Sequence, residues 1–200
     1  MMDTEGPVSP ISFTQQGVIT QYALAIILIV TSDGLLEVAV PVTDDDRRDM
    51  EIHIREKFGR SVALQVKSTT HLAHRFKAYQ LSMFFSVPKD KLINHPNFWY
   101  FFGYFDLKAM AYRDPVFIVP SEEVHTHAAP HLEGDRWTFN FSASLDPASQ
   151  DHWVRWRTPT QEVGSRVLDI FGNEQVGRGA SPLPAELAGL DGLLLVGQSK

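Results

Sequence analysis

Two neighbouring stretches of sequence decide the fold of this chain: Asp49-Met50-Glu51-Ile52-His53-Ile54 and Ser61-Val62-Ala63-Leu64-Gln65-Val66-Lys67-Ser68. Polar and apolar residues alternate along both, which is the period of a β-strand with one buried face. Asp49 begins the polar face of the first stretch, while Gln65 and Lys67 lie on the polar face of the second. The short basic connection between the stretches fits a hairpin, which would bring these three side chains within a few ångströms of one another.

The three side chains suit one kind of chemistry. A hard divalent cation accepts carboxylate and carboxamide oxygens as ligands, and an ammonium group can orient a water molecule or stabilise a phosphate. The same alternation also fits a plain hairpin whose polar face meets solvent. From composition and spacing alone, both interpretations stay open.

Asp49 and the run Gln65-Val66-Lys67-Ser68-Thr69 resemble the core of the PD-(D/E)xK nuclease superfamily, in the variant with Gln-x-Lys in place of Glu-x-Lys. The preceding run Pro41-Val42-Thr43-Asp44-Asp45-Asp46 resembles the loop that brings the catalytic Asp to its strand. The specific match covers residues 14–70, and a weaker likeness continues to residue 120. The resemblance implies an α/β fold with a mixed central β-sheet flanked by helices, the restriction-endonuclease-like core.

The resemblance also implies roles for the residues of this site. Asp49, the Gln65 side-chain oxygen and the Val66 carbonyl would bind Mg²⁺ or Mn²⁺. Lys67 would hold the attacking water or neutralise the phosphate as negative charge builds. The implied activity is metal-dependent hydrolysis of phosphodiester bonds, with DNA as the expected substrate.

One position departs from the family pattern. Family members often carry a Glu on the first helix, but the predicted helix over residues 14–32 contains no acidic residue. Gln21 is the favoured occupant of that position, ahead of Gln15 and Gln16. Glu51, on the Asp49 face, is a second candidate for a supporting carboxylate, although a plain surface role for it is slightly favoured.

Basic side chains gather around the two strands. Residues 47–77 hold eight Lys or Arg and three acidic residues, a balance of +5 in a chain whose formal net charge is −6. Binding to a phosphate backbone requires such a local excess. An ordinary solvated surface would carry the same charge. The candidate nucleic-acid contacts are Arg47, Arg48, His71, His74 and Arg75.

Composition frames the domain organisation. Two hundred residues with 44% hydrophobic content suit one domain with a sizeable core, expected over residues 13–171 between a mobile leader (1–12) and a Gly- and Pro-containing tail (172–200). The absence of cysteine excludes disulfides, thiolate metal sites and a Cys nucleophile. The longest apolar run, residues 22–30, is too short to span a bilayer. The expectation is a cytoplasmic protein without membrane contact, and a homodimer is a possible assembly.

The remaining elements follow from periodicity and chain breakers. The helix over residues 14–32 would have Thr14 as its N-cap, and residues 69–74 would form a turn or short helix. A further short helix is expected at 88–95 and another after residue 159. Strands are expected at residues 35–40, 76–87, 98–107, 116–119 and, at a sheet edge, 137–141.

Three other groups of residues have two interpretations each. His125, His127 and His131 could bind Zn²⁺, but Pro120 and Pro130 flank them and favour a loop with solvated His. Aromatic residues 98–102 could stack on bases, although such a strand is more often core. Residues 153–157, where Trp and Arg alternate, could grip DNA or cover a sheet edge.

Three classes of function therefore compete. The first is a metal-dependent nuclease. The second is a nuclease-fold module that binds nucleic acid with weak or no turnover. The third is an oligomeric interaction protein built on the aromatic strands and the apolar tail.

Overall fold

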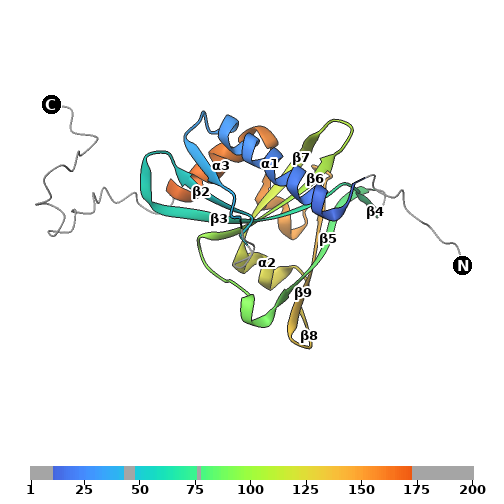
Figure 1. Cartoon of the computed structure of the whole chain (residues 1–200). Helices are drawn as coiled ribbons and strands as arrows, with labels where there is room; N and C mark the ends of the chain where they lie inside the picture. Colours follow the sequence, from blue (N-terminus) through green and yellow to red (C-terminus); the bar gives the residue numbers. More distant parts are fainter. Residues whose placement is uncertain (1–10, 43–47, 76–77, 173–200) are drawn as a thin grey trace, which may run out of the picture.

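The computed structural model describes residues 11–42, 48–75 and 78–172. Two sheets form the framework, and helices cover both faces of the larger one (Figure 1). The helices are α1 (Phe13–Thr31), α2 (Ser121–His127) and α3 (Val163–Gly172), with short 3₁₀ turns η1 (Lys89–Lys91), η2 (His152–Trp156) and η3 (Thr160–Glu162). The strands are β1 (Leu36–Ala39), β2 (Met50–Ile54), β3 (Lys57–Thr69), β4 (Ala73–Arg75), β5 (Ala78–Pro88), β6 (Phe98–Asp106), β7 (Ala111–Pro120), β8 (His131–Glu133), β9 (Arg136–Ser144) and β10 (Arg157–Thr158).

The larger sheet has the strand order β1-β2-β3-β6-β7-β10. Its β3–β6 pair is parallel, with Gln65 opposite Tyr100 and Lys67 opposite Phe102, and its other pairs are antiparallel. The predicted fold class, an α/β protein with a mixed central sheet flanked by helices, is therefore confirmed. A second sheet, β4-β5-β9-β8, is antiparallel throughout and was not expected.

One face of the larger sheet packs against α1 and α3. The side chains of Met50, Ile52, Leu64 and Val66 all point into this core, as the alternation of the two strands predicted. Helix α1 contributes Leu24 and Leu28, while α3 contributes residues from Val163 to Phe171. The polar face of β2 and β3 is thereby left on the opposite side of the sheet.

The opposite face forms a second core with the antiparallel sheet and α2. Phe102 of β6 stacks on Phe141 of β9 with ring centroids 3.8 Å apart, and both side chains are fully buried. Phe98 and Tyr100 are buried in the same cluster. The expectation that residues 98–102 are core is thus confirmed, since these rings hold the two sheets together. Figure 1 shows β5, β9 and β8 extending from the larger sheet as an arm, with α2 beside them.

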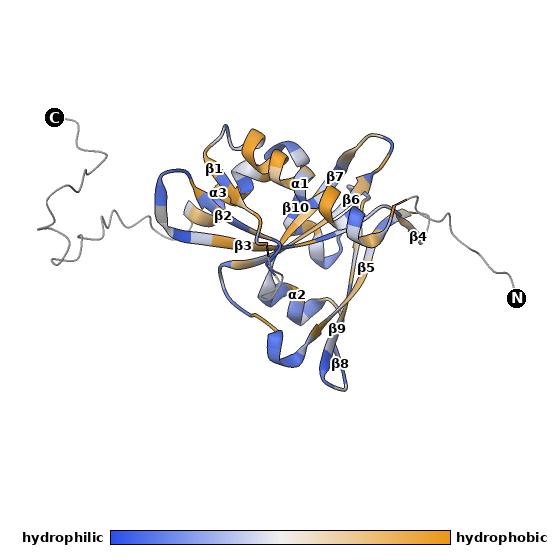
Figure 2. Cartoon of the chain, viewed as in Figure 1, coloured by the Kyte–Doolittle hydropathy of each residue, from blue (hydrophilic) through white to orange (hydrophobic). Residues whose placement is uncertain are grey.

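Helix α1 begins earlier than predicted. Ser12, not Thr14, is the N-cap: its hydroxyl accepts from the Gln15 N–H while the Gln15 side chain accepts from the Ser12 N–H. This reciprocal capping box satisfies two N–H groups that the first turn leaves without partners. By length and composition alone α1 could cross a bilayer. In this fold α1, which is apolar along much of its length (Figure 2), lies on the larger sheet. Its exposed side chains include Tyr22 and Ile26.

Several predicted boundaries were wrong. Residues 70–72 form the connection between β3 and β4, so of the two forms expected at 69–74 the turn is present and the helix is not. Strand β7 extends over ten residues instead of four. The strand at 137–141 belongs to β9, which is interior to its sheet because β8 covers one side and β5 the other. The assigned leader (residues 1–12) and tail (172–200) lie almost entirely outside the described residues.

Candidate active site

Asp49 lies directly before β2, at the point where β2 and β3 separate. Its backbone N–H donates to the Leu64 carbonyl (3.0 Å), which extends the pairing of the two strands by one residue. Its Oδ2 accepts from the Gln65 Nε2 at 2.5 Å and from the Val66 backbone N–H at 2.6 Å. The Asp49 carboxylate thus accepts the Val66 N–H of β3, which a backbone carbonyl would accept if β2 continued.

The predicted metal ligands meet at this point. The N–H and C=O of a strand residue point toward the same neighbouring strand, so the Val66 carbonyl is directed to the side of Asp49. The Gln65 side chain is buried beside the Asp49 carboxylate. Because a carboxamide carries an oxygen as well as an NH₂ group, rotation of its terminal bond would present that oxygen to a cation. Asp49, Gln65 and Val66 are therefore brought together as the sequence predicted.

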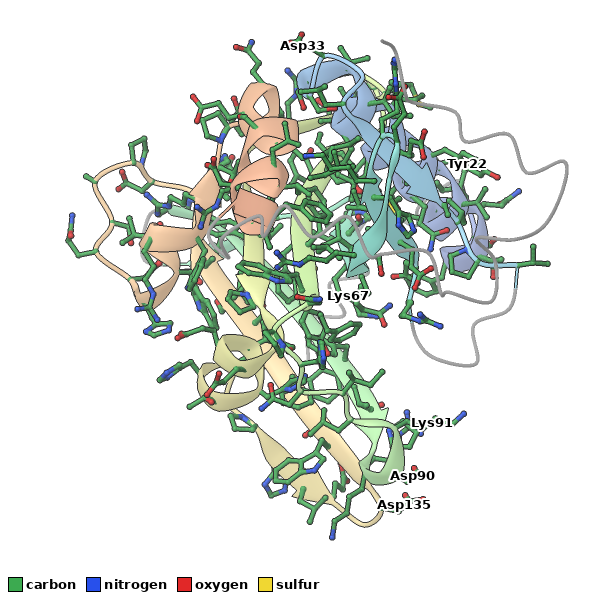
Figure 3. The ribbon with its side chains drawn as sticks, turned by 90° about the vertical axis from the view of Figure 1, so that its left-hand side faces the viewer. Tyr22, Asp33, Lys67, Asp90, Lys91 and Asp135 are labelled. Atoms are coloured by element: carbon green, nitrogen blue, oxygen red, sulfur yellow. The ribbon has the colours of Figure 1, made fainter. Side chains whose placement is uncertain are left out.

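Lys67 lies on the same face of β3, one step further along the strand. Its side chain is half-buried, and Nζ lies 5.5 Å from the centroid of the Phe85 ring on β5. Figure 3 shows Lys67 at the junction between the larger sheet and the arm. Contact with the face of an aromatic ring steadies an ammonium group without neutralising its charge.

Three hollows follow this polar face. The first, of about 350 Å³, is lined by residues that include Arg48, Glu51 and His95. A narrow second one, between Gln65 and Lys67 on one side and η1 on the other, shares Ile93 and Phe98 with the first. The third, of about 590 Å³, shares Lys67 and Phe85 with the second. Residues shared between their linings place the three hollows side by side along β3, with Lys67 and Phe85 between the second and the third. The second hollow has room for about one water molecule.

Helix α1 contributes Gln16 to this site. Gln16 Nε2 donates to the Ser68 carbonyl at 2.9 Å, and Thr70 Oγ1 donates to Gln16 Oε1 at 3.4 Å. One turn further along the same face, the Thr20 carbonyl accepts from the Tyr112 hydroxyl, which also bonds to Ser68 Oγ at 2.6 Å. Among the described residues, Gln21 forms no such bond to β3. Gln16 is thus a glutamine of α1 that contacts β3, whereas the supporting role of Gln21 stays a prediction.

Glu51 lies beside the Asp49 contact without joining it. Its Oε1 pairs with Arg48 Nη1 at 2.5 Å, and both side chains are about one-third exposed. The pair lines the first hollow, two residues along the strand from Asp49. The Glu51 carboxylate therefore balances part of the Arg48 charge, which weakens Arg48 as a contact for phosphate.

The other predicted nucleic-acid contacts that the structure describes, His71 and His74, lie in different surroundings. His71 lines the third hollow together with Lys67 and bonds through Nδ1 to Thr70 Oγ1 at 3.0 Å. His74 lies in β4, edge-on to Tyr79 with ring centroids 5.2 Å apart. Arg47 and the side chain of Arg75 lie outside the described part of the chain. The two His residues are on a strand and its approach, so they do not share a helix surface.

A contact between the buried Tyr100 and the half-buried His125, next to this site, was not predicted. The Tyr100 hydroxyl and His125 Nε2 lie 3.0 Å apart, and Tyr100 lines the second hollow with Gln65 and Lys67. Burial lowers the pKa of His125 to about 4, and Nδ1 of His125 has no hydrogen-bond partner among the described residues. The imidazole is therefore neutral at pH 7. The sequence holds no local signal for this contact, because α2 and β6 meet only in the folded chain.

This pair predicts a pH dependence of stability. Unfolded His protonates near pH 6.5 and folded His125 only near pH 4, so the unfolded state binds more protons between these values. Stability contributed by His125 is complete above pH 6.5 and is lost as the pH falls toward 4. Between pH 7 and 5, the free energy of unfolding should fall by about 1 kcal/mol more in the wild type than in His125→Phe, after allowing for partial solvent screening. Urea denaturation at both pH values measures this, and equal slopes would contradict a neutral His125.

The three His residues considered as a zinc site do not come together. His125 faces Tyr100, whereas His131 is exposed on β8. The segment expected to be a loop is helix α2: Pro120 precedes its first residue, where the missing N–H costs nothing. His127 instead lies beside Glu123 and His152. Partial burial raises the pKa of Glu123, but hydrogen bonds from His152 and Arg155 outweigh it and hold that pKa below its usual range.

Residues 153–157 cover the sheet rather than present a row of cations. Trp153 is buried against Phe141, with ring centroids 4.6 Å apart. Arg155 and Arg166 both lie over the Trp156 ring. Of the two interpretations, the structure favours packing.

Comparison with known proteins gives one structural likeness. No protein-family model matches the chain, and no curated protein is detectably similar to it in sequence. A solved structure of a bacterial homing endonuclease is similar in fold, at 12% sequence identity and a TM-score of 0.48, over 82% of this chain and 97% of that one. At this level the likeness concerns the course of the chain alone, and function has to be inferred from the side chains.

Proposed function

We propose that this protein is a divalent-metal-dependent nuclease that hydrolyses phosphodiester bonds, with DNA as the expected substrate. The observation that carries the proposal is the convergence of Asp49, Gln65 and the Val66 backbone at the start of β2, one step from Lys67. Such oxygen donors suit Mg²⁺ or Mn²⁺, and a bound ion would supply the positive charge that polarises a phosphate.

Each residue of the candidate active site has its own proposed role. Asp49 and Gln65 would hold the ion, and the Val66 carbonyl would add a neutral ligand. Lys67 would orient the attacking water or balance charge on the phosphate, steadied by the Phe85 ring. Beyond Lys67, the third hollow offers the nucleic-acid backbone a surface on which Lys67, His71 and hydroxyl groups of β3 lie beside apolar side chains such as Phe84.

A specific observation supports a second candidate, a nuclease-fold module that binds nucleic acid with weak or no turnover. Asp49 is the one carboxylate among the proposed ligands, and α1, from Phe13 to Thr31, contains no acidic residue. Gln16, which lies against β3, is neutral too. Fewer negative ligands mean weaker attraction for the cation, so metal affinity should be low.

A cleavage assay separates the two candidates. Plasmid, single-stranded and branched DNA would be incubated with the full chain and Mg²⁺, Mn²⁺ or Ca²⁺ at about 10 mM, roughly ten times the dissociation constant of the weakest protein Ca²⁺ sites. We expect cleavage with Mg²⁺ or Mn²⁺ and its complete loss on chelation. DNA binding without cleavage under every condition would favour the binding module. If the protein neither cleaves nor binds DNA, both the nuclease and the binding module are contradicted. The oligomeric interaction protein would then be the remaining candidate.

Cytoplasmic location, a homodimeric state and the absence of membrane contact stay predictions. Helix α1 is apolar along much of its length (Figure 2), and its exposed side chains include Tyr22, Ile26 and Val30. An apolar surface of this kind suits a subunit interface. Sedimentation of the full chain at several concentrations would measure the oligomeric state.

A further inference from the structure

A second cluster of ligand-type side chains lies on α2 and η2, away from the candidate active site. Glu123 and His127 are one turn apart on α2, and His152 approaches them from η2. Glu123 Oε2 lies 3.0 Å from His152 Nε2 and 3.9 Å from His127 Nε2. The two imidazole rings have centroids 4.1 Å apart, and the ligand atoms of all three residues lie within 4.8 Å of one another.

These distances suit a zinc ion. Donor atoms bound to tetrahedral Zn²⁺ at about 2.0–2.1 Å lie roughly 3.3 Å from one another. The three side chains need only small rotamer adjustments to reach this spacing. Two imidazoles and one carboxylate are also a ligand set that zinc accepts, with a fourth position left for water. We propose that Glu123, His127 and His152 bind Zn²⁺ and thereby join α2 to η2.

The backbone around the cluster is already held in place. Val124, next to Glu123, is fully buried. Asp151 caps η2 by accepting from the Trp153 N–H at 3.0 Å, and Trp153 lies edge-on to His152 with ring centroids 4.9 Å apart. Ligands on such fixed supports lose little conformational freedom when the ion binds, which raises affinity.

Arg155 is the competitor for this position. Its Nη2 lies 2.5 Å from Glu123 Oε2 and 3.5 Å from His152 Nε2, so a cation already balances the carboxylate. The Arg155 side chain is about half exposed, and its guanidinium also lies over the Trp156 ring at 5.2 Å. It can therefore leave Glu123 without losing all its contacts. Removal of Arg155 should consequently strengthen zinc binding. If the cluster were only an ion-pair network, the same substitution would produce no gain in zinc affinity.

The experiment is titration of Zn²⁺ and Co²⁺ into the full-length, tag-free protein, followed by calorimetry and by the visible absorption of bound Co²⁺. We expect one site per chain with tetrahedral Co²⁺ bands. His127→Ala and His152→Ala should each weaken binding at least 10-fold, by analogy with losses of about 10- to 100-fold from weaker, indirect changes at metal sites. Arg155→Ala should tighten it several-fold, while the exposed His131→Ala should leave it unchanged.

Asp49→Asn serves as a second control, because the candidate active site also offers oxygen ligands. Zinc binding that survives Asp49→Asn and disappears in the His127→Ala/His152→Ala double variant supports the proposal. Zinc binding that persists in the double variant would overturn it, and so would failure of the folded wild type to bind either ion. Circular dichroism of each variant would show that the loss of binding is not a loss of fold.

Discussion

Asp49→Asn is expected to lower metal-dependent DNA cleavage by about 100- to 1000-fold, the range seen when one electrostatic contact to a developing charge is removed. The substitution removes the charge that draws the cation but keeps an oxygen able to accept from the Val66 N–H. Metal affinity should fall in parallel, because the remaining proposed ligands are neutral. Cleavage rates and Mn²⁺ titrations of wild type and variant measure both effects.

Asn is a sharper choice than Ala at this position. The Asp49 carboxylate accepts from two groups of β3, and the Gln65 side chain that provides one of them is buried. Asp49→Ala would leave these donors without a partner at a cost of about 1–3 kcal/mol. A loss of cleavage in that variant would mix chemistry with folding. Asp49→Asn keeps most of the structure and tests the charge.

A matched control and a partner variant complete this test. Asp33→Asn makes the same chemical change at an exposed turn with φ of 52°, where Asn is well tolerated; Figure 3 shows Asp33 far from Lys67. Lys67→Met keeps the apolar stem over Phe85 but removes the ammonium, so cleavage should be lost while metal binding persists. Cleavage that survives both Asp49→Asn and Lys67→Met would mean that the chemistry occurs elsewhere.

The strand faces could be predicted from the sequence because alternation is a local property. Met50 and Leu64 are buried, and Gln65 and Lys67 lie on the opposite face, because successive side chains of a strand point to opposite sides. The same pattern excludes a register shifted by one residue, which would turn every core side chain of β3 to the polar face. It does not predict the shift in pairing between His53 and Ile54 that sets the final register.

The helix contact to β3 could not be predicted in the same way. Helix α1 is apolar on nearly every side, so its sequence shows no stripe that marks the buried face. Thr20, Leu24 and Leu28 are buried, which turns Gln16 toward Ser68 and leaves Gln21 on another side of the helix. Tertiary packing decides this orientation. The same holds for His125, whose partner Tyr100 is 25 residues away in the chain.

Gly164→Ala is expected to destabilise the fold by about 3 kcal/mol, at the upper end of ordinary overpacking. A Cβ at Gly164 would lie 2.4 Å from the Ser32 backbone nitrogen and 2.5 Å from the Thr31 carbonyl carbon. Backbone atoms cannot rotate away as a side chain can. The close approach also allows the Gly164 N–H to donate to Thr31 Oγ1 at 2.7 Å, which ties α3 to the end of α1. To admit the methyl group, the two helices would have to separate and weaken this bond.

Gly17→Ala provides the control of opposite sign. Gly17 lies in the exposed first half of α1, and a Cβ there would meet nothing within 4 Å. Alanine in a helix interior should stabilise it by about 0.5–1 kcal/mol relative to glycine. Urea denaturation of both variants against wild type gives the two changes in the free energy of unfolding. Helix propensity alone favours Ala at both positions, and only the backbone of Thr31 and Ser32 opposes it at Gly164. Equal effects of the two substitutions on the free energy of unfolding would therefore contradict a close contact between α1 and α3.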